Sequence, residues 1–247
     1  MPGSQPVALL VGAGDAIGAA VARRCAAGGL AVCIARRDAT KSQAVVDGIA
    51  AKGGAARAFS IDARQESDVQ TLFATVEREV GPIELCLFNA GSNVNTPLTD
   101  TSATLFRKAW ELACYGGFLT GREAARYMVP RGKGTILFTG ATASLRSGPG
   151  FAAFASAKFG LRAVAQSMAR ELGPKNIHVA HLVIDGGVDS EAIRKRMRAR
   201  IGDAVDSLPA DSLIQTSSIA QAYWNLHLQP RDAWTHELDL RPALEKW

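Results

Sequence analysis

The sequence has no hydrophobic run that approaches the ~20 residues a helix needs to span a bilayer. Residues 1–6 also lack the basic and apolar regions of a secretory signal peptide, and strand-like residues follow at once. These absences argue against the membrane and secreted classes of protein. We therefore expect a cytoplasmic protein that binds no membrane.

Patterns typical of disulfides and metal sites are missing as well. The cysteines are Cys25, Cys33, Cys86 and Cys114. None forms a C-x-x-C pair and each lies in an apolar stretch, so we expect buried free thiols in a reducing compartment. The histidines are scattered, and His178 and His181 suit structural hydrogen bonds better than metal ligation. No metal site is predicted.

The sequence also has no recognisable nucleic-acid module. The formal net charge is +5, but we find no zinc-finger spacing, no interleaving of aromatic and basic residues, and no compact helix-turn-helix unit. The one dense basic run spans Arg194–Arg200. A solvated basic helix face is the simpler interpretation of that run, so nucleic-acid binding is not expected.

Short apolar strands alternate with helical stretches along the chain. The predicted strands are Val7–Val11, Ala31–Ala35, Ala56–Ile61, Ile83–Phe88, Thr135–Thr139, Ile177–Val183 and a stretch around Leu238–Leu240. The predicted helices are Ile17–Ala27, Thr40–Lys52, Gln65–Val80, Ser102–Met128 and Phe151–Leu172. Continuous apolar strands between helices indicate an α/β fold: a doubly wound parallel sheet of about seven strands, covered on both faces. With 247 residues and 47% hydrophobic residues, one domain over residues 1–247 is expected.

Small residues interrupt the long helical stretch that begins at Ser102. Gly116, Gly117 and Gly121 each cost ~1 kcal/mol relative to alanine inside a helix. Small residues let helices approach closely, so these glycines serve either cofactor access or helix packing in an oligomer. The sequence leaves both uses open.

A glycine-rich turn joins the first predicted strand to the first helix. Gly12, Gly14, Ile17 and Gly18 lie in the segment Val11-Gly-Ala-Gly-Asp-Ala-Ile-Gly18. Glycines permit a tight turn and let the backbone approach a pyrophosphate at the helix N-terminus. A plain tight turn is the alternative, but the position at the first strand-to-helix junction favours a dinucleotide site.

Basic residues follow the second strand, where an acidic residue would bind the ribose of NAD. Arg36 occupies that position and Arg37 follows it. Guanidinium groups favour a 2′-phosphate, so NADP is the expected cofactor, with NAD still possible. Asp15, in the phosphate turn, argues mildly against NADP by repulsion, and ordinary surface charge is the other interpretation of the arginines.

Further candidate residues follow the third and fourth strands. Asp62 and Ala63 follow the third, and Asn89, Ala90 and Gly91 follow the fourth. Ligands bind at the carboxyl ends of strands in open α/β sheets, so we expect these residues to contact the cofactor. Asn89 alternatively serves as a turn residue that satisfies local backbone groups.

Together these residues resemble the short-chain dehydrogenase/reductase family over essentially the whole chain. The resemblance also rests on the segment Phe154-Ala-Ser-Ala-Lys158 and on the segment Asp185–Ser190. It implies a Rossmann-like fold, a nicotinamide cofactor, a small-molecule substrate and a homodimer or homotetramer. By the same resemblance Val188 and Ser190 hold the nicotinamide amide, and residues 189–213 form a substrate lid.

The family resemblance also implies a catalytic Asn-Ser-Tyr-Lys tetrad, of which this sequence keeps the lysine. Lys158 matches and would hold the nicotinamide ribose, whereas Ala113, Ala141 and Phe154 stand at the other three positions. Phenylalanine keeps the ring and loses the acid that a tyrosine beside Lys158 would supply. The spacing of the enoyl reductases gives Phe151, which also lacks a hydroxyl.

The nearest other hydroxyls are weak substitutes. Thr142 and Ser144 are poor acids, and Tyr115 lies two residues from the asparagine position, so a helix points it elsewhere. Two hypotheses remain. The chain is either an NADP-dependent oxidoreductase with an altered proton path, acting on a small carbonyl or enoyl substrate, or a catalytically impaired cofactor-binding sensor or scaffold.

Overall fold

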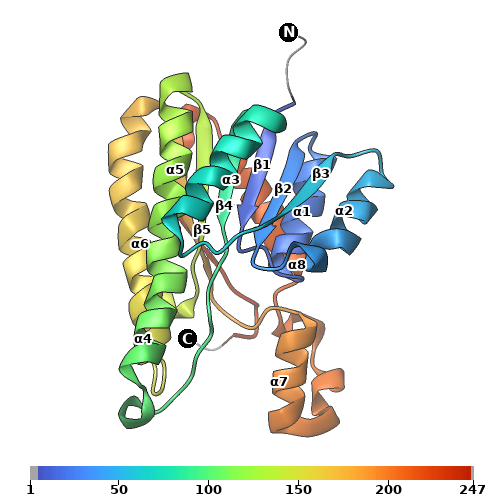
Figure 1. Ribbon diagram of the computed structural model, residues 1–247. Helices are drawn as coiled ribbons and strands as arrows, with labels where there is room; N and C mark the ends of the chain where they lie inside the picture. The colour runs from blue at the N-terminus through green and yellow to red at the C-terminus, as the bar shows by residue number, and fades with distance from the viewer. Residues whose placement is uncertain (1–4, 246–247) are drawn as a thin grey trace.

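A seven-stranded parallel sheet organises the computed structural model, which describes residues 5–245 (Figure 1). The strand order is β3-β2-β1-β4-β5-β6-β7, and every neighbouring pair is parallel. The strands are β1 Val7–Val11, β2 Ala31–Arg36, β3 Ala56–Ser60, β4 Ile83–Phe88, β5 Gly134–Thr139, β6 Ile177–Ile184 and β7 Glu237–Leu240. The order reverses between β1 and β4, which confirms the doubly wound α/β prediction.

Helices cover both faces of the sheet and bury two separate apolar cores. The helices are α1 Ile17–Ala27, α2 Gln43–Ala50, α3 Glu66–Glu79, α4 Ala103–Trp110, α5 Gly116–Arg131, α6 Ala152–Leu172, α7 Glu191–Ile201 and α8 Thr216–His227. One core joins the sheet to α3, α5 and α6, and the other joins it to α1, α2 and α8. Neighbouring residues of β1 alternate between them: Leu9 packs into the first and Leu10 into the second. Both strand faces are buried, which explains the continuous apolar runs.

The predicted helix Ser102–Met128 is not one regular helix. A π-helical turn, Glu111–Tyr115, separates α4 from α5, and α5 continues to Arg131. Glycines bring this segment close to its neighbours: a Cβ at Gly117 would lie 2.3 Å from Leu161 of α6, and one at Gly121 would lie 2.8 Å from Phe138 of β5. Packing within the chain is therefore a third use of these glycines, beside the two that the sequence left open.

Two smaller differences concern α2 and α8. The predicted helix Thr40–Lys52 consists of a 3-10 turn, Ala39–Ser42, followed by the shorter α2. Helix α8 was not predicted, although it packs against α1 and contributes Tyr223 and Trp224 to the second core. Its polar first turn weakens the apolar periodicity that would identify it from sequence.

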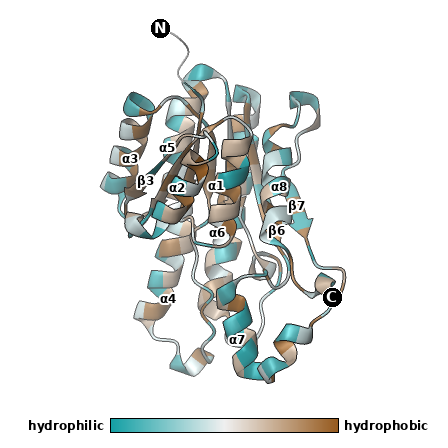
Figure 2. Ribbon diagram, turned by 90° about the vertical axis from the view of Figure 1, so that its right-hand side faces the viewer, coloured by the Kyte–Doolittle hydropathy of each residue, from teal (hydrophilic) through white to brown (hydrophobic). Residues whose placement is uncertain are grey.

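Helix α7 stands apart from the sheet and its covering helices, and its surface is largely hydrophilic (Figures 1 and 2). The Ser190 hydroxyl accepts a hydrogen bond from the Ile193 N–H at 3.3 Å and so caps the N-terminus of the helix. The basic run is partly paired, because Arg194 binds Asp189 and Arg198 binds Asp206. Most of its other residues are exposed, as a solvated helix face requires.

Within residues 5–245, no helix is long and apolar enough to cross a membrane. The same residues contain no group of three or more side chains suited to a metal ion. All four cysteines are free and buried, as the sequence predicts. The absence of leader features concerns residues 1–6, of which 1–4 lie outside the described part of the chain.

Candidate functional site

Two adjoining cavities lie along the carboxyl ends of the central strands. The first, about 600 Å³, is bordered by the glycine-rich turn and by the residues that follow β2, β3 and β4. The second, about 730 Å³, lies between the start of α1 and the start of α7. Gly14 and Asn89 border both cavities, so the two adjoin along this edge, and we call them together the groove.

Backbone conformation and close packing explain the glycines of the turn. Gly12 has a φ of +77°, and a Cβ there would lie 2.5 Å from Ala90. Gly14 faces open space at the junction of the two cavities. Gly18 lies behind the turn, where a Cβ would meet Ala13 at 2.6 Å, and it borders neither cavity. Gly12 and Gly14 therefore shape the groove, whereas Gly18 supports the turn from behind.

Asn89 is held by a buried hydrogen-bond chain at the junction of the cavities. Its side chain donates to the Gly12 carbonyl at 3.4 Å and accepts from the Thr139 hydroxyl at 2.9 Å. The Thr139 hydroxyl also lies 2.7 Å from the hydroxyl of Tyr223, whose pKa is raised by burial. Asn89 thus ties three chain segments together, which agrees with the structural role that the sequence left open. Sequence reasoning missed Tyr223, because it comes from the unpredicted α8.

Basic residues gather at the end of the first cavity near β2 and β3. Arg36, Arg37 and Lys41 all border it. The Arg36 guanidinium forms an ion pair with Asp15 at 2.5 Å. The repulsion expected from Asp15 is therefore offset within the turn itself. Lys41 was not predicted as a site residue; it reaches the cavity because the turn Ala39–Ser42 begins directly after β2.

Asp62 and Ala63 border the same cavity, but the Asp62 carboxylate already has a partner. Arg64 binds it from two guanidinium nitrogens, at 2.9 Å from Nε and 2.5 Å from Nη2. These hydrogen bonds are the main reason that the pKa of Asp62 lies below its usual value. A ligand at this end therefore meets a neutralised carboxylate.

Lys158 is 4% exposed and comes from the first half of α6. Its Nζ donates a hydrogen bond to the Thr139 carbonyl at 2.7 Å. A Cβ placed on Gly91, which borders the first cavity, would lie 3.3 Å from that Nζ. Burial lowers the pKa of Lys158 to about 8. A desolvated ammonium thus lies directly behind the wall of the groove.

Phe151, Phe154, Ala141 and Ala113, which the sequence singled out together with Lys158, all carry apolar side chains. Phe154 lies one turn earlier on α6, and its ring is 6.4 Å from that of Phe151, with both side chains partly exposed. Ala141 directly follows Gly140 at the end of β5, and Ala113 is fully buried in the π-helical turn. None of the four side chains can donate or accept a proton.

The nearby hydroxyls are engaged elsewhere. Thr142 donates to Asp185 at 2.6 Å, and the Ser144 hydroxyl accepts from the Ala141 N–H at 3.1 Å. The Tyr115 ring stacks between the rings of Trp110 and Phe118. Thr142 and Ser144 therefore fix the loop after β5.

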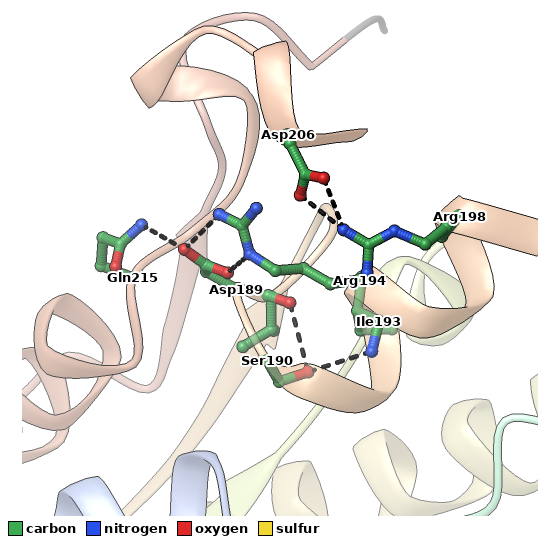
Figure 3. Close-up of polar contacts among 8 residues, drawn as sticks. Asp189, Ser190, Ile193, Arg194, Arg198, Asp206 and Gln215 are labelled. Atoms are coloured by element: carbon green, nitrogen blue, oxygen red, sulfur yellow. Dashed lines mark hydrogen bonds and ion pairs between the residues drawn. The ribbon is translucent and has the colours of Figure 1, made fainter. Parts of the chain in front are cut away.

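The second cavity contains the predicted residues Ile17, Val188 and Ser190. Figure 3 shows how its α7 side is held: the Asp189 carboxylate accepts from Arg194 Nε at 2.5 Å and from Gln215 Nε2 at 3.0 Å. These bonds join the first turn of α7 to the segment before α8. The structure thus gathers all predicted cofactor residues along one groove except Gly18 and Lys158, which lie immediately behind its walls.

A sequence profile described as short chain dehydrogenase matches residues 6–200, most of the chain. The chain belongs to the short-chain dehydrogenase/reductase family. Its strand order and flanking helices give the Rossmann-like fold that the resemblance implied.

Three known members show how far the similarity extends. A short-chain dehydrogenase/reductase of Armillaria gallica is 33% identical over 176 residues, covering 70% of this chain and 67% of the relative. The crystal structure of a short-chain dehydrogenase from Rhodopseudomonas palustris has 47% identity and a TM-score of 0.82, covering 96% of this chain and 98% of its own. A metagenomic short-chain oxidoreductase, solved in complex with NADP, has 24% identity and a TM-score of 0.82, covering 98% and 99% of the two chains. The family is that of NAD(P)-dependent oxidoreductases.

Proposed function

We propose that this protein is an NADPH-dependent oxidoreductase that transfers hydride to a small carbonyl or enoyl substrate by an unusual proton path. The observation that carries the proposal is the groove of two adjoining cavities, bordered by a glycine-rich turn and backed by Lys158 behind Gly91. The metagenomic relative solved with NADP supports a dinucleotide as its ligand.

The groove fits a dinucleotide in shape and charge. Among the described residues, no side chain caps the N-terminus of α1 and no acidic residue lies in its first helical turn, so its free N–H groups suit a pyrophosphate beside Gly14. Asp62, Ala63, Ala90 and Gly91 would border the adenosine half, and Ile17, Val188 and Ser190 the nicotinamide half. Asn89 would hold the junction, as its hydrogen bonds suggest.

The cations near β2 favour NADPH over NADH. Arg37 and Lys41 border the cavity without the short carboxylate contact that Arg36 makes with Asp15. Guanidinium groups match a phosphate in geometry as well as charge. We propose that Arg37 and Lys41, together with Arg36, bind the 2′-phosphate, with NAD as the weaker ligand.

At the reacting end, bound NADPH would supply the hydride and Lys158 would bind its ribose. We propose that Ala113, Ala141 and Phe154 occupy the positions where the family tetrad carries its polar groups. The protein then positions the two reactants and provides the ammonium charge of Lys158, while the three other tetrad positions carry no hydroxyl, phenol or amide.

A second candidate function is that of a catalytically impaired sensor or scaffold that binds the cofactor. The placement of Thr142 and Ser144 favours it, because Thr142 donates its hydroxyl proton to Asp185 and Ser144 is fully buried. Lys158 agrees with both candidates, since it would bind ribose in either.

A measurement of turnover distinguishes the two candidate functions. The absorbance of protein-bound NADPH is followed with a panel of carbonyl compounds and enoyl thioesters. Oxidation by at least one acceptor supports the enzyme, and tight binding without turnover across the panel supports the sensor or scaffold. If neither NADPH nor NADH binds, both candidates are wrong.

We further propose that residues 1–247 act as one dinucleotide-binding domain, with residues 189–213 as its substrate lid. A homodimer or homotetramer is supported by half-exposed aromatic side chains on α4, α5 and α6, namely Phe106, Trp110, Phe118 and Phe159. Free buried cysteines agree with a cytoplasmic location. No nucleic-acid or membrane partner is proposed.

A further inference from the structure

The second cavity of the groove extends beyond the residues that we assign to the nicotinamide half. Arg23 of α1 and Lys195 of α7 border it together with Ile17 and Ser190. At a rise of about 1.5 Å per residue, Arg23 lies about 9 Å along α1 from Ile17, the first residue of that helix. Lys195 lies about 6 Å along α7 from Glu191, the first residue of its helix. We call the part of the cavity near Arg23 and Lys195 its outer end.

Among residues 5–245, the two cations at the outer end have no carboxylate partner. Neither Arg23 nor Lys195 forms an ion pair in this part of the chain, and both side chains are exposed. Arg194, the residue before Lys195 in the basic run of α7, differs because it binds Asp189 (Figure 3). Arg23 and Lys195 are therefore available to a ligand in the cavity.

The three carboxylates that border the same cavity do not cancel these two charges. Asp15 is paired with Arg36, and Asp189 is paired with Arg194. Glu191 lies in the first turn of α7, where the helix dipole stabilises a negative side chain. Among the described residues, two unpaired cations thus stand against one unpaired carboxylate, which leaves the lining with an excess of one positive charge.

The outer end lies between two separate parts of the molecule. Helix α1 packs against the sheet, whereas α7 stands apart from it (Figure 1). A negative group between them would meet one cation from each wall, and a cleft lined by charges of one sign concentrates ions of the opposite sign. The ammonium and the guanidinium both donate hydrogen bonds to oxyanions. The outer end therefore suits a small oxyanion.

The size of the positive excess distinguishes the common oxyanions. A carboxylate carries one negative charge, whereas a phosphate monoester carries about 1.5–2 negative charges near pH 7. A carboxylate therefore balances the lining of the cavity, and a phosphate monoester would make it negative.

We propose that the acceptor carries a carboxylate, which Arg23 and Lys195 bind at the outer end while its carbonyl or enoyl group lies beside the nicotinamide. This inference rests on the proposed function and names the substrate class of that same site. In the proposed function the pyrophosphate of the cofactor lies beside Gly14 and its 2′-phosphate beside Arg37. Neither phosphate therefore occupies the outer end.

The carboxylate site can be tested by binding, without turnover. The probes are 4-oxopentanoate, 6-oxoheptanoate and 8-oxononanoate, which vary the distance between carbonyl and carboxylate. Each is compared with its methyl ester, which removes the charge and keeps the ketone. Calorimetric titration uses the NADP⁺-saturated protein, because the oxidised cofactor cannot reduce a ketone. We expect the acid to bind at least about tenfold tighter than its ester for at least one chain length, the effect of a charge-assisted hydrogen bond.

Substitution of either cation should remove most of that preference. Arg23→Met and Lys195→Met each delete one charge from the outer end and should leave NADP⁺ affinity nearly unchanged. The matched control is Arg196→Met, which removes an exposed cation of α7 that borders neither cavity and should keep the preference. Added salt should weaken the preference in the wild type, because the two cations are exposed. Circular dichroism establishes that each variant is folded.

Four results would overturn the inference, each in a different way. If no acid binds measurably, or if each acid binds only as tightly as its ester, the outer end is not a carboxylate site. If the preference persists in either Arg23→Met or Lys195→Met, the carboxylate is not bound between the two cations. If a substitution weakens NADP⁺ binding as much as it weakens binding of the acid, the cations serve the cofactor. If neither dinucleotide binds, the proposed function fails and the inference fails with it.

Discussion

The β2 end of the groove and the start of α6 behind Gly91 differ in chemistry. The groove near β2 and β3 is polar and charged, and Arg36 and Asp62 are held there by ion pairs. The start of α6 carries the apolar Phe154 and a single buried cation, Lys158, whose Nζ lies behind Gly91. A dinucleotide needs the first kind of surface along most of its length, whereas we propose that the second sets the chemistry at the nicotinamide. Under that proposal, one family fold separates cofactor binding from proton transfer.

We expect the largest effect on catalysis from restoring polar side chains at the three apolar positions proposed to match the family tetrad. We expect Ala113→Asn, Ala141→Ser and Phe154→Tyr together to raise the reduction of a simple ketone by about 10²–10⁴-fold, the usual contribution of general acid catalysis. Phe154→Tyr alone should give far less, because Ala141 leaves the new phenol without a hydroxyl neighbour. Steady-state kcat/KM for the two variants is the measurement, with circular dichroism to check that the buried position of Ala113 tolerates the larger asparagine side chain. Equal activities would refute the idea of a shared site.

Disrupting the glycine-rich turn should weaken the binding of NADPH. Gly12→Val places a side chain at a φ of +77° and 2.5 Å from Ala90, so the turn must move. We expect NADPH affinity to fall by at least about 100-fold, alongside a backbone strain of about 1–3 kcal/mol. Fluorescence titration with NADPH and thermal unfolding measure the two effects.

The matched control for that variant is Gly48→Ala on α2. A Cβ there meets no atom within 4 Å, so the turn stays in place and affinity should not change. An equal loss of affinity in both variants would mean that the loss does not come from the turn.

The buried ammonium of Lys158 should alter stability between pH 8 and pH 10.5. Its pKa is lowered from 10.5 to about 8 in the folded protein, so the unfolded chain binds more protons in that window. The free energy of unfolding therefore gains a favourable contribution as pH rises, of up to about 3 kcal/mol. Urea unfolding at several pH values should show this rise in the wild type relative to Lys158→Met. Parallel pH dependences in the two proteins would contradict the burial of a charged Lys158.

The smallest predicted effect concerns the selectivity for NADPH that we assign to the cations near β2. We expect Arg37→Ala to weaken NADPH binding about tenfold, the loss of roughly one charge-assisted phosphate contact, while NADH binding stays unchanged. Competition titration with both dinucleotides measures the selectivity. Arg57→Ala is the control, because Arg57 pairs with Glu79 away from the groove. If NADH affinity falls as much as NADPH affinity, Arg37 does not recognise the 2′-phosphate.

Much of the fold follows from sequence pattern alone. Continuous apolar runs such as Val7–Val11 and Ile83–Phe88 predict buried parallel strands, and the bounds agree with those of β1 and β4. The π-helical turn was not predictable, because it arises where Gly117 lets α5 approach α6 and the sheet. The apolar periodicity of one segment does not predict such a contact between helices.

The residues that line the groove could be predicted from the sequence, but the contacts between them could not. Gly12, Arg36 and Asn89 were each identified by their place at a strand end, a position fixed by local sequence. The pairing of Asp15 with Arg36 and the bond between Thr139 and Tyr223 join segments far apart in the chain. No short motif encodes such long-range partners, so Tyr223 emerged only from the structure. Lys41 was missed because Thr40–Lys52 was predicted as one regular helix, without the 3-10 turn that brings it to the cavity.

Calorimetric titration of the wild-type protein with NADPH and then with NADH tests the central claim most directly. The claim is that the chain keeps a dinucleotide groove although the proposed tetrad positions other than Lys158 are apolar. Saturable binding of NADPH, about tenfold or more tighter than that of NADH, is the predicted result. Absence of binding to either dinucleotide would contradict the account.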